Sequence, residues 1–327
     1  MTLFSVVLGL SSIALGSKES DFVSELEGLL SSGRSGIALV EVRGSIVDGY
    51  ASGGGSVGAD YIRGLLREAR ENDSIKAVLL YINSPGGTVG GTKKIYDAVM
   101  RVRSKKKPVV AVIGGIAASG GYYIASAADK ILAQRGSLIG SIGVISLRFN
   151  IAGFLKTHGI GVTVIKSGRY KDMSYPFRAM TGEELAMRNR VQRAAYEQFI
   201  LDVAEGRKKS PNFVRANWAD ARIFSGEEAD REKMIDDLGG REKAREVVRD
   251  ILKMSRKLPI LAPRRGFLQN FLEGLSASHR VQARVPENEV MRRLLSAPAL
   301  YYYTGAPLFG LDFARGLGFP SARRFGR

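Results

Sequence analysis

From residue 36 onward, short apolar runs alternate with amphipathic stretches, and this alternation is the strongest constraint on the fold. The runs GIALVEVRG (36–44), IKAVLLYIN (75–83) and KPVVAVIGG (107–115) have the composition of buried strands. Stretches with helical spacing of apolar residues separate them, at 61–70 and 90–104. Strand–helix alternation with nearly continuous apolar strands predicts an α/β fold, with a mostly parallel sheet flanked by helices.

Three further segments complete the expected pattern. The small-residue stretch 120–129 is expected to form a helix, and KILAQ (130–134) a short strand. The glycine-rich stretch 45–60 is expected to be a loop, because three consecutive glycines leave little to pack. Apolar residues at 162–166 predict one more strand.

Composition removes several classes of chemistry. The chain has 327 residues and is 45% hydrophobic, which is enough for a full core. It contains no cysteine, so disulfides, thiolate nucleophiles, iron–sulfur clusters and cysteine-type zinc sites are excluded. Its two histidines, His158 and His279, are too few for a histidine-rich metal site, and no metal is expected.

Charge and apolar residues are distributed unevenly along the chain. The formal net charge is +17, and the segment 251–327 holds thirteen basic residues against four acidic ones. This segment is either a solvated basic tail or a region that contacts lipid or nucleic acid. The run Leu3–Gly16 is shorter than the roughly 20 residues that cross a bilayer. It fits either membrane contact or a buried, oligomer-forming helix.

Two glycine-rich junctions follow predicted strands. Active sites of parallel sheets lie beyond the carboxyl ends of strands, where loops meet helix N-termini. In YINSPGGTVGG (81–91), Gly86 and Gly87 can turn successive N–H groups outward as an anion cradle, although an ordinary strand-to-helix turn explains the same residues. The second junction is GGIAASGGYYIASAADK (114–130).

Ser119 lies in the second junction, between a predicted strand and a predicted helix. Its hydroxyl is expected at the sheet edge, where the N–H of Gly120 and that of Gly86 or Gly87 can bind a developing oxyanion. The small neighbours of Ser119 equally fit tight helix–sheet packing. The hydrolase signature Gly-x-Ser-x-Gly is absent, because Ala117 occupies its first position.

A nucleophilic serine needs a base, and neither histidine has an acid near it in sequence to orient it. A lysine can serve if burial keeps it neutral, which requires its pKa to fall by about 3 units, or roughly 4 kcal/mol. Lys171, in IKSGRYKDMSYPF (165–177), has Tyr170, Met173 and Tyr175 beside it. The alternative is that Lys171 is an ordinary exposed lysine in a loop.

Four motifs resemble the signal peptide peptidase A family of membrane-bound serine proteases, in its short, single-repeat form. They are YINSPGG, AASGGYYIASAADKI, GSLIGSIGVI and IKSGRYKD, in the family's order and approximate spacing. The resemblance implies a Clp/crotonase-like fold of repeated ββα-type units. It also implies that Ser119 is the nucleophile, that Lys171 is the general base and that Ser141 holds the lysine amine. One departure is Ala221, where the family has the glycine of Asp-Gly-Arg.

The resemblance covers about 36–250 and divides the chain into three regions. These are an N-terminal apolar anchor or oligomerisation segment (1–35), a Ser-Lys peptidase domain (36–250) and a basic C-terminal tail of unknown role (251–327). It implies a serine endopeptidase that needs no cofactor and cleaves signal-peptide remnants or other extended apolar peptides. It also implies a homo-oligomeric ring at the cell membrane, with the catalytic domain on the extracytoplasmic side, membrane lipid as a contact and no nucleic acid partner.

Three other interpretations stay open at this stage. A Clp-type Ser-His-Asp peptidase would place a histidine about two dozen residues after the serine, where this chain has none. A crotonase-type acyl-CoA enzyme would use oxyanion glycines and dispense with Ser119. A non-catalytic membrane or nucleic-acid scaffold would depend on the basic tail.

Overall fold

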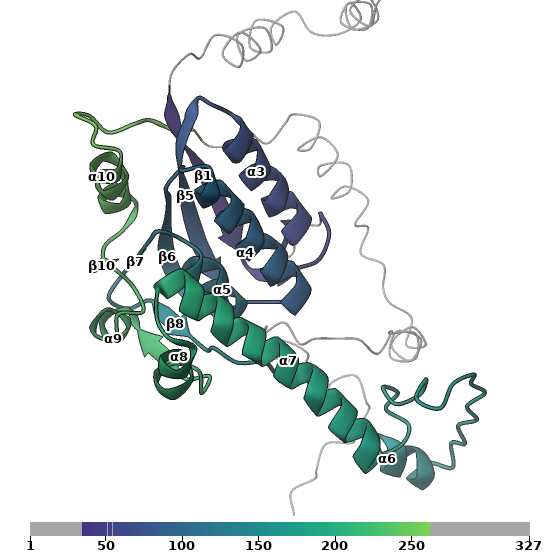
Figure 1. The fold of residues 1–327 in the computed structure, drawn as a ribbon. Coiled ribbons are helices and arrows are strands. Elements are labelled where there is room, and N and C mark those ends of the chain that lie inside the picture. The colour runs from purple at the N-terminus through teal and green to yellow at the C-terminus, as the bar shows by residue number, and fades with distance from the viewer. Residues whose placement is uncertain (1–34, 51, 54, 262–327) are drawn as a thin grey trace, which may run out of the picture.

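The computed structural model describes residues 35–50, 52–53 and 55–261, which form a parallel sheet with helices on both faces (Figure 1). The strands lie in the order β10-β7-β6-β5-β1-β11, and β8 and β9 extend the sheet beyond β6. All of these pairs are parallel except β8 with β9. The bounds are β1 (Gly36–Arg43), β5 (Ile75–Ser84), β6 (Val109–Ala118), β7 (Lys130–Ala133), β8 (Leu138–Gly140), β9 (Ile223–Ser225), β10 (Asp237–Leu238) and β11 (Ile260–Leu261). The predicted α/β fold is confirmed.

The central strands are apolar throughout because both of their faces are covered. In β5, Val78 and Leu80 belong to one hydrophobic cluster, whereas Leu79 between them belongs to another. The first cluster packs under α3 (Ala59–Glu71), α4 (Val89–Ser104), α5 (Gly120–Ser126) and the end of α7 (Gly182–Arg207). The second packs under α10 (Arg241–Ile251). Side chains of a strand alternate between faces, so a strand buried on both faces has no polar alternation.

The stretch predicted as a loop at 45–60 instead contains a small second sheet, and that prediction is wrong. It consists of β2 (Ser45–Val47), β3 (Ser52–Gly53) and β4 (Ser56–Gly58). The reason is that Ile46 and Val57 are buried apolar residues that fix the segment on the core. Ile46 also donates to the Gly86 carbonyl (2.8 Å) and accepts from the Thr88 N–H (2.8 Å), so this sheet holds the first glycine-rich junction in place.

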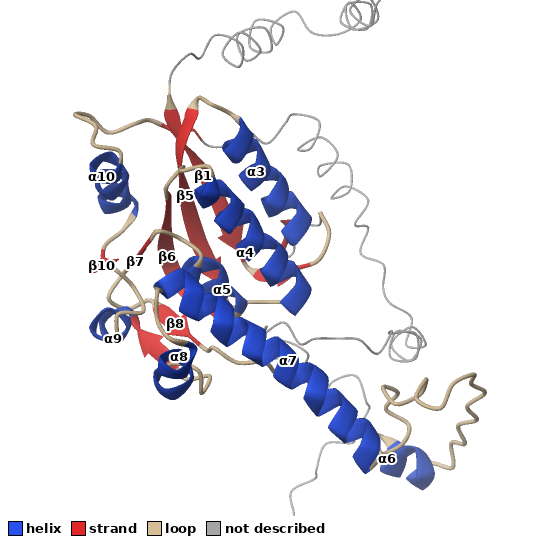
Figure 2. Cartoon of the chain, viewed as in Figure 1, coloured by secondary structure: helices blue, strands red, loops and turns tan. Residues whose placement is uncertain are grey.

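A long arm projects from the body of the molecule (Figure 2). It consists of α6 (Ala152–Thr157), the loop that follows and the N-terminal part of α7, whose C-terminal part is packed in the core. The strand predicted at 162–166 does not form, and Ile165 is 97% exposed. A strand needs a neighbour to complete its hydrogen bonds, and no described strand pairs with this segment.

Of the remaining described helices, α8 (Pro211–Asn217) packs on α7, and α9 (Gly226–Arg231) packs on β8, β9 and β10. Within the part of the chain that the structure describes, no helix has the length and apolar character needed to cross a membrane. Leu3–Gly16, His279 and most of the basic tail lie outside the described residues. The three-region division therefore stays a prediction, and the sheet continues past residue 250 through β11.

Candidate active site

Ser119 lies where β6 ends and α5 begins, as the sequence predicts. Its backbone has φ 50° and ψ −120°, a conformation that is costly for a residue with a side chain. The residue is half-buried, and its hydroxyl makes no hydrogen bond to any described residue. A strained turn that holds an unpaired hydroxyl at a helix N-terminus is suited to a nucleophile.

The turn from β5 into α4 brings its glycines against Ser119. Gly86 has φ 105°, and a Cβ added there would lie 3.0 Å from the Ser119 Cβ and 2.7 Å from the Gly120 nitrogen. A Cβ on Gly87 would lie 1.9 Å from the Ile46 carbonyl oxygen. Only glycine fits at these two positions, because the chains approach too closely for a side chain.

The backbone donors at this point differ in availability. The N–H of Gly86 donates to the Ser84 hydroxyl (3.1 Å). By contrast, the N–H groups of Gly87 and Gly120 have no acceptor among the described residues. The nitrogen of Gly87 lies 3.2 Å from the position that a Gly120 Cβ would take, so the two donors are close neighbours. Gly87 and Gly120 are therefore the better pair of oxyanion donors, and Gly86 provides the turn.

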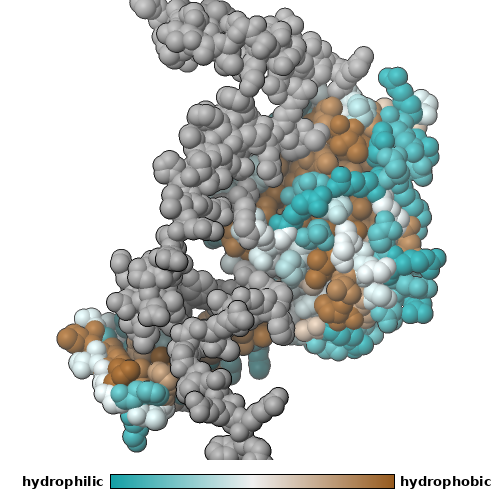
Figure 3. All heavy atoms as spheres, turned by 180° about the vertical axis from the view of Figure 1, so that it is seen from behind, coloured by the Kyte–Doolittle hydropathy of each residue, from teal (hydrophilic) through white to brown (hydrophobic). Residues whose placement is uncertain are grey.

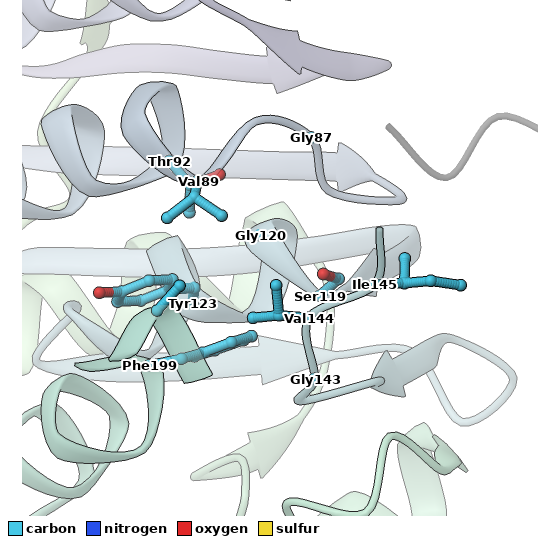
Figure 4. A pocket seen from close by; sticks show the side chains of 11 residues that line it. Gly87, Val89, Thr92, Ser119, Gly120, Tyr123, Gly143, Val144, Ile145 and Phe199 are labelled. Atoms are coloured by element: carbon cyan, nitrogen blue, oxygen red, sulfur yellow. The ribbon is translucent and has the colours of Figure 1, made fainter. Parts of the chain in front are cut away.

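A cavity opens beside Ser119, and its walls are mostly apolar (Figure 4). Figure 4 shows Ser119 near Val144 and Ile145, with Tyr123 and Phe199 farther along the cavity. The Tyr123 and Phe199 rings are stacked, with centroids 4.4 Å apart. The lining residues are Gly87, Val89, Thr92, Ser119, Gly120, Tyr123, Gly143, Val144, Ile145, Ala195 and Phe199. Such a cavity suits an apolar side chain of an extended peptide.

Tyr123 is fixed from below the cavity by a polar network. Its hydroxyl donates to the buried carboxylate of Asp202 on α7, which also lies 3.4 Å from the Lys93 amine. Burial raises the pKa of Tyr123, so its hydroxyl stays protonated and remains a donor. The network ties α4, α5 and α7 together behind the cavity wall.

Ser141 lies beside Ser119, as the resemblance implies. The Ser119 N–H donates to the Gly140 carbonyl (2.8 Å), and the Ser141 N–H donates to the Arg222 carbonyl (2.8 Å). Ser141 is half-buried and has φ 51°. The structure thus brings Ser119, Ser141, Gly86, Gly87 and Gly120 to one edge of the sheet.

Lys171 lies elsewhere, on the projecting arm. It is exposed and does not line the cavity. Its neighbour Asp172 is bridged through Arg178 to Glu184, near the start of α7. Ala195, the residue of this helix that lines the cavity nearest to Glu184, is eleven residues farther along, which corresponds to about 16 Å. Among the described residues of one chain, the Lys171 amine makes no hydrogen bond to Ser119 or Ser141.

The loop that carries Lys171 is held by a charged cluster. Arg178 donates from Nε to Asp172 Oδ2 (2.9 Å) and from Nη1 to Glu184 Oε2 (2.8 Å), and Lys166 donates to Asp172 Oδ1 (2.5 Å). The Arg178 hydrogen bonds lower the pKa of Asp172 well below its usual range and that of Glu184 to about 2. Glu184 also completes a capping box with Thr181. The loop thus has a defined attachment to the start of α7.

Two residues at the cavity were not singled out by the sequence reasoning. The hydroxyl of Thr92 is buried without a hydrogen-bond partner among the described residues, and Phe199 comes from a helix eighty residues after Ser119. Thr92 lies one turn into the helix that follows Gly86 and Gly87, and this position could have identified it as a residue of the site. Phe199 had no comparable signal. His158 is exposed on the arm, where its ring packs on Phe154, and it does not line the cavity.

Comparison with known proteins agrees with this geometry. The model of peptidase family S49 matches residues 101–255, and the Clp protease model matches residues 56–141. A protein of Methanocaldococcus jannaschii named as a protease is 40% identical over 197 residues, which is 60% of this chain and 63% of the relative. A protein of Enterococcus faecium named as a signal peptide peptidase SppA is 35% identical, over 59% of this chain and 55% of the relative. The chain thus spans somewhat more than half the length of these two relatives.

A third relative is covered more fully. A Synechocystis protein named as a protease is 37% identical over 215 residues, which is 65% of this chain and 73% of that protein. The matched regions contain the β6–α5 junction with Ser119, and the Clp model fits the observed parallel sheet. The chain therefore belongs to peptidase family S49 and is a signal peptide peptidase A-like protein.

Proposed function

We propose that the chain is a serine endopeptidase in which Ser119 is the nucleophile and Lys171 the general base. The observation that carries this proposal is the arrangement around Ser119. Its hydroxyl lies on a strained turn, beside two N–H groups and next to an apolar cavity, and none of these three polar groups has a hydrogen-bond partner in the part of the chain that the structure describes. The family membership supports a serine protease.

Each step of hydrolysis has a group assigned to it. The Ser119 hydroxyl attacks the peptide carbonyl carbon while the neutral amine of Lys171 accepts its proton. The N–H groups of Gly87 and Gly120 donate to the oxyanion of the tetrahedral intermediate. The lysine ammonium then gives its proton to the leaving amine. Water, deprotonated by the same amine, hydrolyses the acyl-enzyme, and the Ser141 hydroxyl holds the amine in position.

We propose that Lys171 comes from a second copy of the chain. Its loop is attached near the start of α7, about 16 Å of helix before Ala195, the first residue of α7 that lines the cavity. A projecting arm can, however, reach the cavity of a neighbouring molecule. A head-to-tail arrangement of this kind closes into a ring when its rotation allows, which is the homo-oligomer proposed for this chain.

The surface of the arm supports such an association. Hydrophobic side chains gather at its far end (Figure 3). Phe149 is 71% exposed, and Phe154, Ile160, Val162, Val164 and Ile165 are also exposed. Contiguous exposed apolar residues on an otherwise charged protein commonly mark an interface. The segment 162–166, which pairs with none of the described strands of its own chain, can gain a strand partner there.

The substrates proposed are signal-peptide remnants or other extended apolar peptides. The cavity beside Ser119 is lined by valine, isoleucine, alanine and aromatic residues, which favour an apolar side chain. With such substrates, we propose that the enzyme works at the cell membrane with its catalytic domain on the extracytoplasmic side.

Active-site labelling tests the proposal directly. The full chain is incubated with a fluorophosphonate, and the modified residue is mapped by mass spectrometry. We expect modification at Ser119, lost in Ser119→Ala and strongly reduced in Lys171→Ala, and peptide hydrolysis lost in both. Ser126→Ala is a matched control, because that hydroxyl is buried in α5 and bonded to the Tyr123 carbonyl (2.7 Å). Hydrolysis retained in Lys171→Ala would rule out the dyad.

A further inference from the structure

A second hollow lies between α3 and α4, away from the cavity beside Ser119. Four arginines surround it: Arg63, Arg67 and Arg70 from α3, and Arg101 from α4. The spacing 63, 67, 70 places the three α3 residues on one face of the helix, and Arg101 faces them from the neighbouring helix. We call this hollow the α3–α4 groove. Figure 1 shows the two helices side by side.

The charge of the α3–α4 groove is only partly neutralised. Arg63 pairs with Asp60 (3.1 Å), the acidic residue that also lines the hollow, and Arg70 pairs with Glu71 (2.7 Å). The side chains of Arg67 and Arg101 have no ion-pair or hydrogen-bond partner among the described residues. Two guanidinium groups that line one hollow and have no ion pair of their own among the described residues are suited to a phosphate, which can accept two parallel hydrogen bonds from each.

The shape of the groove depends on a glycine. Gly64 lies in the hollow between the arginines, and a Cβ added there would meet no atom within 4 Å. A glycine in a helix interior is less favourable than alanine, so its presence favours a use for the open space. Tyr50 also lines the groove, and it is 71% exposed.

We infer that the α3–α4 groove binds the phosphate group of an anionic membrane lipid. Three observations favour a lipid surface over nucleic acid. The groove is a single hollow, whereas nucleic acid needs a track of basic residues along its backbone. An exposed tyrosine beside basic residues is typical of the membrane interface. The apolar run Leu3–Gly16 and the net charge of +17 both suit contact with an anionic bilayer.

This site would orient the protein on the membrane and is independent of peptide hydrolysis, since none of the groove residues lines the cavity beside Ser119. Binding is measured with the full chain by co-sedimentation with vesicles of phosphatidylcholine alone and with added phosphatidylglycerol. The quantity compared is the gain in affinity caused by phosphatidylglycerol, because contacts elsewhere in the chain contribute to both vesicle types.

The double variant Arg67→Gln/Arg101→Gln is expected to lower this gain at least tenfold, since each basic residue at the surface adds about 1 kcal/mol of attraction. Arg231→Gln/Arg256→Gln is the matched control, with the same charge lost from two exposed arginines that have no ion pair among the described residues. We expect this control to bind nearly as the parent does. Hydrolysis of a short soluble peptide should be unchanged in both double variants.

Two further variants separate a built groove from diffuse charge. Gly64→Gln fills the hollow without changing the charge and should also lower the gain. Tyr50→Trp places an indole at the groove, and its fluorescence should shift to the blue on phosphatidylglycerol vesicles, while the parent's Trp218 is fully buried and should not respond. Equal losses in the two double variants, an unchanged gain in Gly64→Gln or an unshifted indole would overturn the inference. If the groove variants lower binding to duplex DNA but leave binding to the vesicles unchanged, the groove binds nucleic acid instead of lipid.

Discussion

Ser119 and Ser141 both have a positive φ, of 50° and 51°, directly after two paired strands. The Ser119 N–H donates to the carbonyl of Gly140, the residue before Ser141, at 2.8 Å. Both positions carry a side chain where glycine would be less strained. Strain of this kind persists where the surrounding structure enforces it, and the proposed mechanism gives both hydroxyls a use.

The role of the Ser141 hydroxyl can be separated from its backbone strain. Ser141→Ala removes the hydroxyl and keeps the strain, whereas Ser141→Gly removes the hydroxyl and relieves about 1 kcal/mol of it. We expect both variants to hydrolyse a fluorogenic peptide on the order of a hundredfold more slowly, and Ser141→Gly to melt at a higher temperature than Ser141→Ala. Ser141→Thr keeps a hydroxyl and should retain more activity than either. Full activity in Ser141→Gly would leave Ser141 without a role in orienting the amine.

The oxyanion donors can be disturbed without touching Ser119. In Gly120→Ala the new Cβ would lie 2.5 Å from the Thr92 hydroxyl and 3.2 Å from the Gly87 nitrogen, so the donors must move. We expect a loss of about a hundredfold or more in kcat, the size seen when one oxyanion donor is removed. Adding Thr92→Ala relieves the closest contact and should recover part of the loss.

Gly90→Ala is the matched control for this experiment, because its Cβ would meet no atom within 4 Å. We expect parental activity, with stability equal to the parent or raised by up to about 1 kcal/mol through better helix propensity. Parental kcat in Gly120→Ala would argue against an oxyanion site formed by Gly87 and Gly120.

The fold and about half of the site residues could be predicted from the sequence, for a physical reason. Strands such as β5 and β6 are continuous apolar runs ended by glycine-rich turns, so their carboxyl ends, and with them Gly87 and Ser119, could be located. The segment 162–166 has the same apolar character but pairs with none of the described strands, and the hydrophobic pattern of a segment does not show whether a neighbouring strand exists. The assignment of Lys171 depended on resemblance, because its relation to Ser119 is not set by local pattern. Phe199 reaches the cavity only through the packing of α7.

The cavity beside Ser119 should set the preferred side chain of the substrate. Ala195→Leu places a larger side chain on the cavity wall, and we expect it to lower kcat/KM about tenfold or more for peptides with leucine or phenylalanine before the scissile bond. Peptides with alanine at that position should be affected much less. Ala194→Leu, at the exposed neighbouring position of the same helix, is the control and should leave the profile unchanged. An equal loss for all peptides would mean that this cavity does not hold that side chain.

The arm should loosen in acid. Arg178 lowers the pKa of Glu184 to about 2 and that of Asp172 below its usual range, so both carboxylates contribute stability that is present above their unfolded pKa values near 4. This contribution is lost as the pH falls from about 4 through the folded pKa values. We expect protease cleavage within the arm to stay constant from pH 7 to 5 and to rise below pH 4, measured with an acid-active protease at its lower end.

Arg178→Gln removes the cause of both shifts. Its arm should be cleaved faster already at pH 7 and should show a weaker dependence on pH between 4 and 2. Arg169→Gln breaks an exposed pair with Glu183 (2.7 Å) on the same arm and is the control, since exposed pairs contribute little. The assignment fails if the two variants have the same cleavage profile.

Mixing two inactive variants tests whether Lys171 acts on a neighbouring molecule. Ser119→Ala retains the lysine and Lys171→Ala retains the serine, so each homo-oligomer lacks one half of every dyad. If the arm of one molecule serves the cavity of the next, a mixed assembly contains some sites with both parental residues. At equal amounts in a random mixture, a site has the parental serine with probability one half and the parental lysine from its neighbour with probability one half. We therefore expect about a quarter of the parental activity, an estimate that follows from the proposed transfer between copies.

The two variants are unfolded together and refolded, or co-expressed, and hydrolysis and fluorophosphonate labelling are measured. The Lys171→Ala chain should become labelled at Ser119 only in the mixture. The double variant Ser119→Ala/Lys171→Ala, mixed with the parent, controls for effects of mixing itself. Absence of activity in mixtures that are shown by native mass spectrometry to contain both chains would mean that Lys171 does not complete the site of a neighbour.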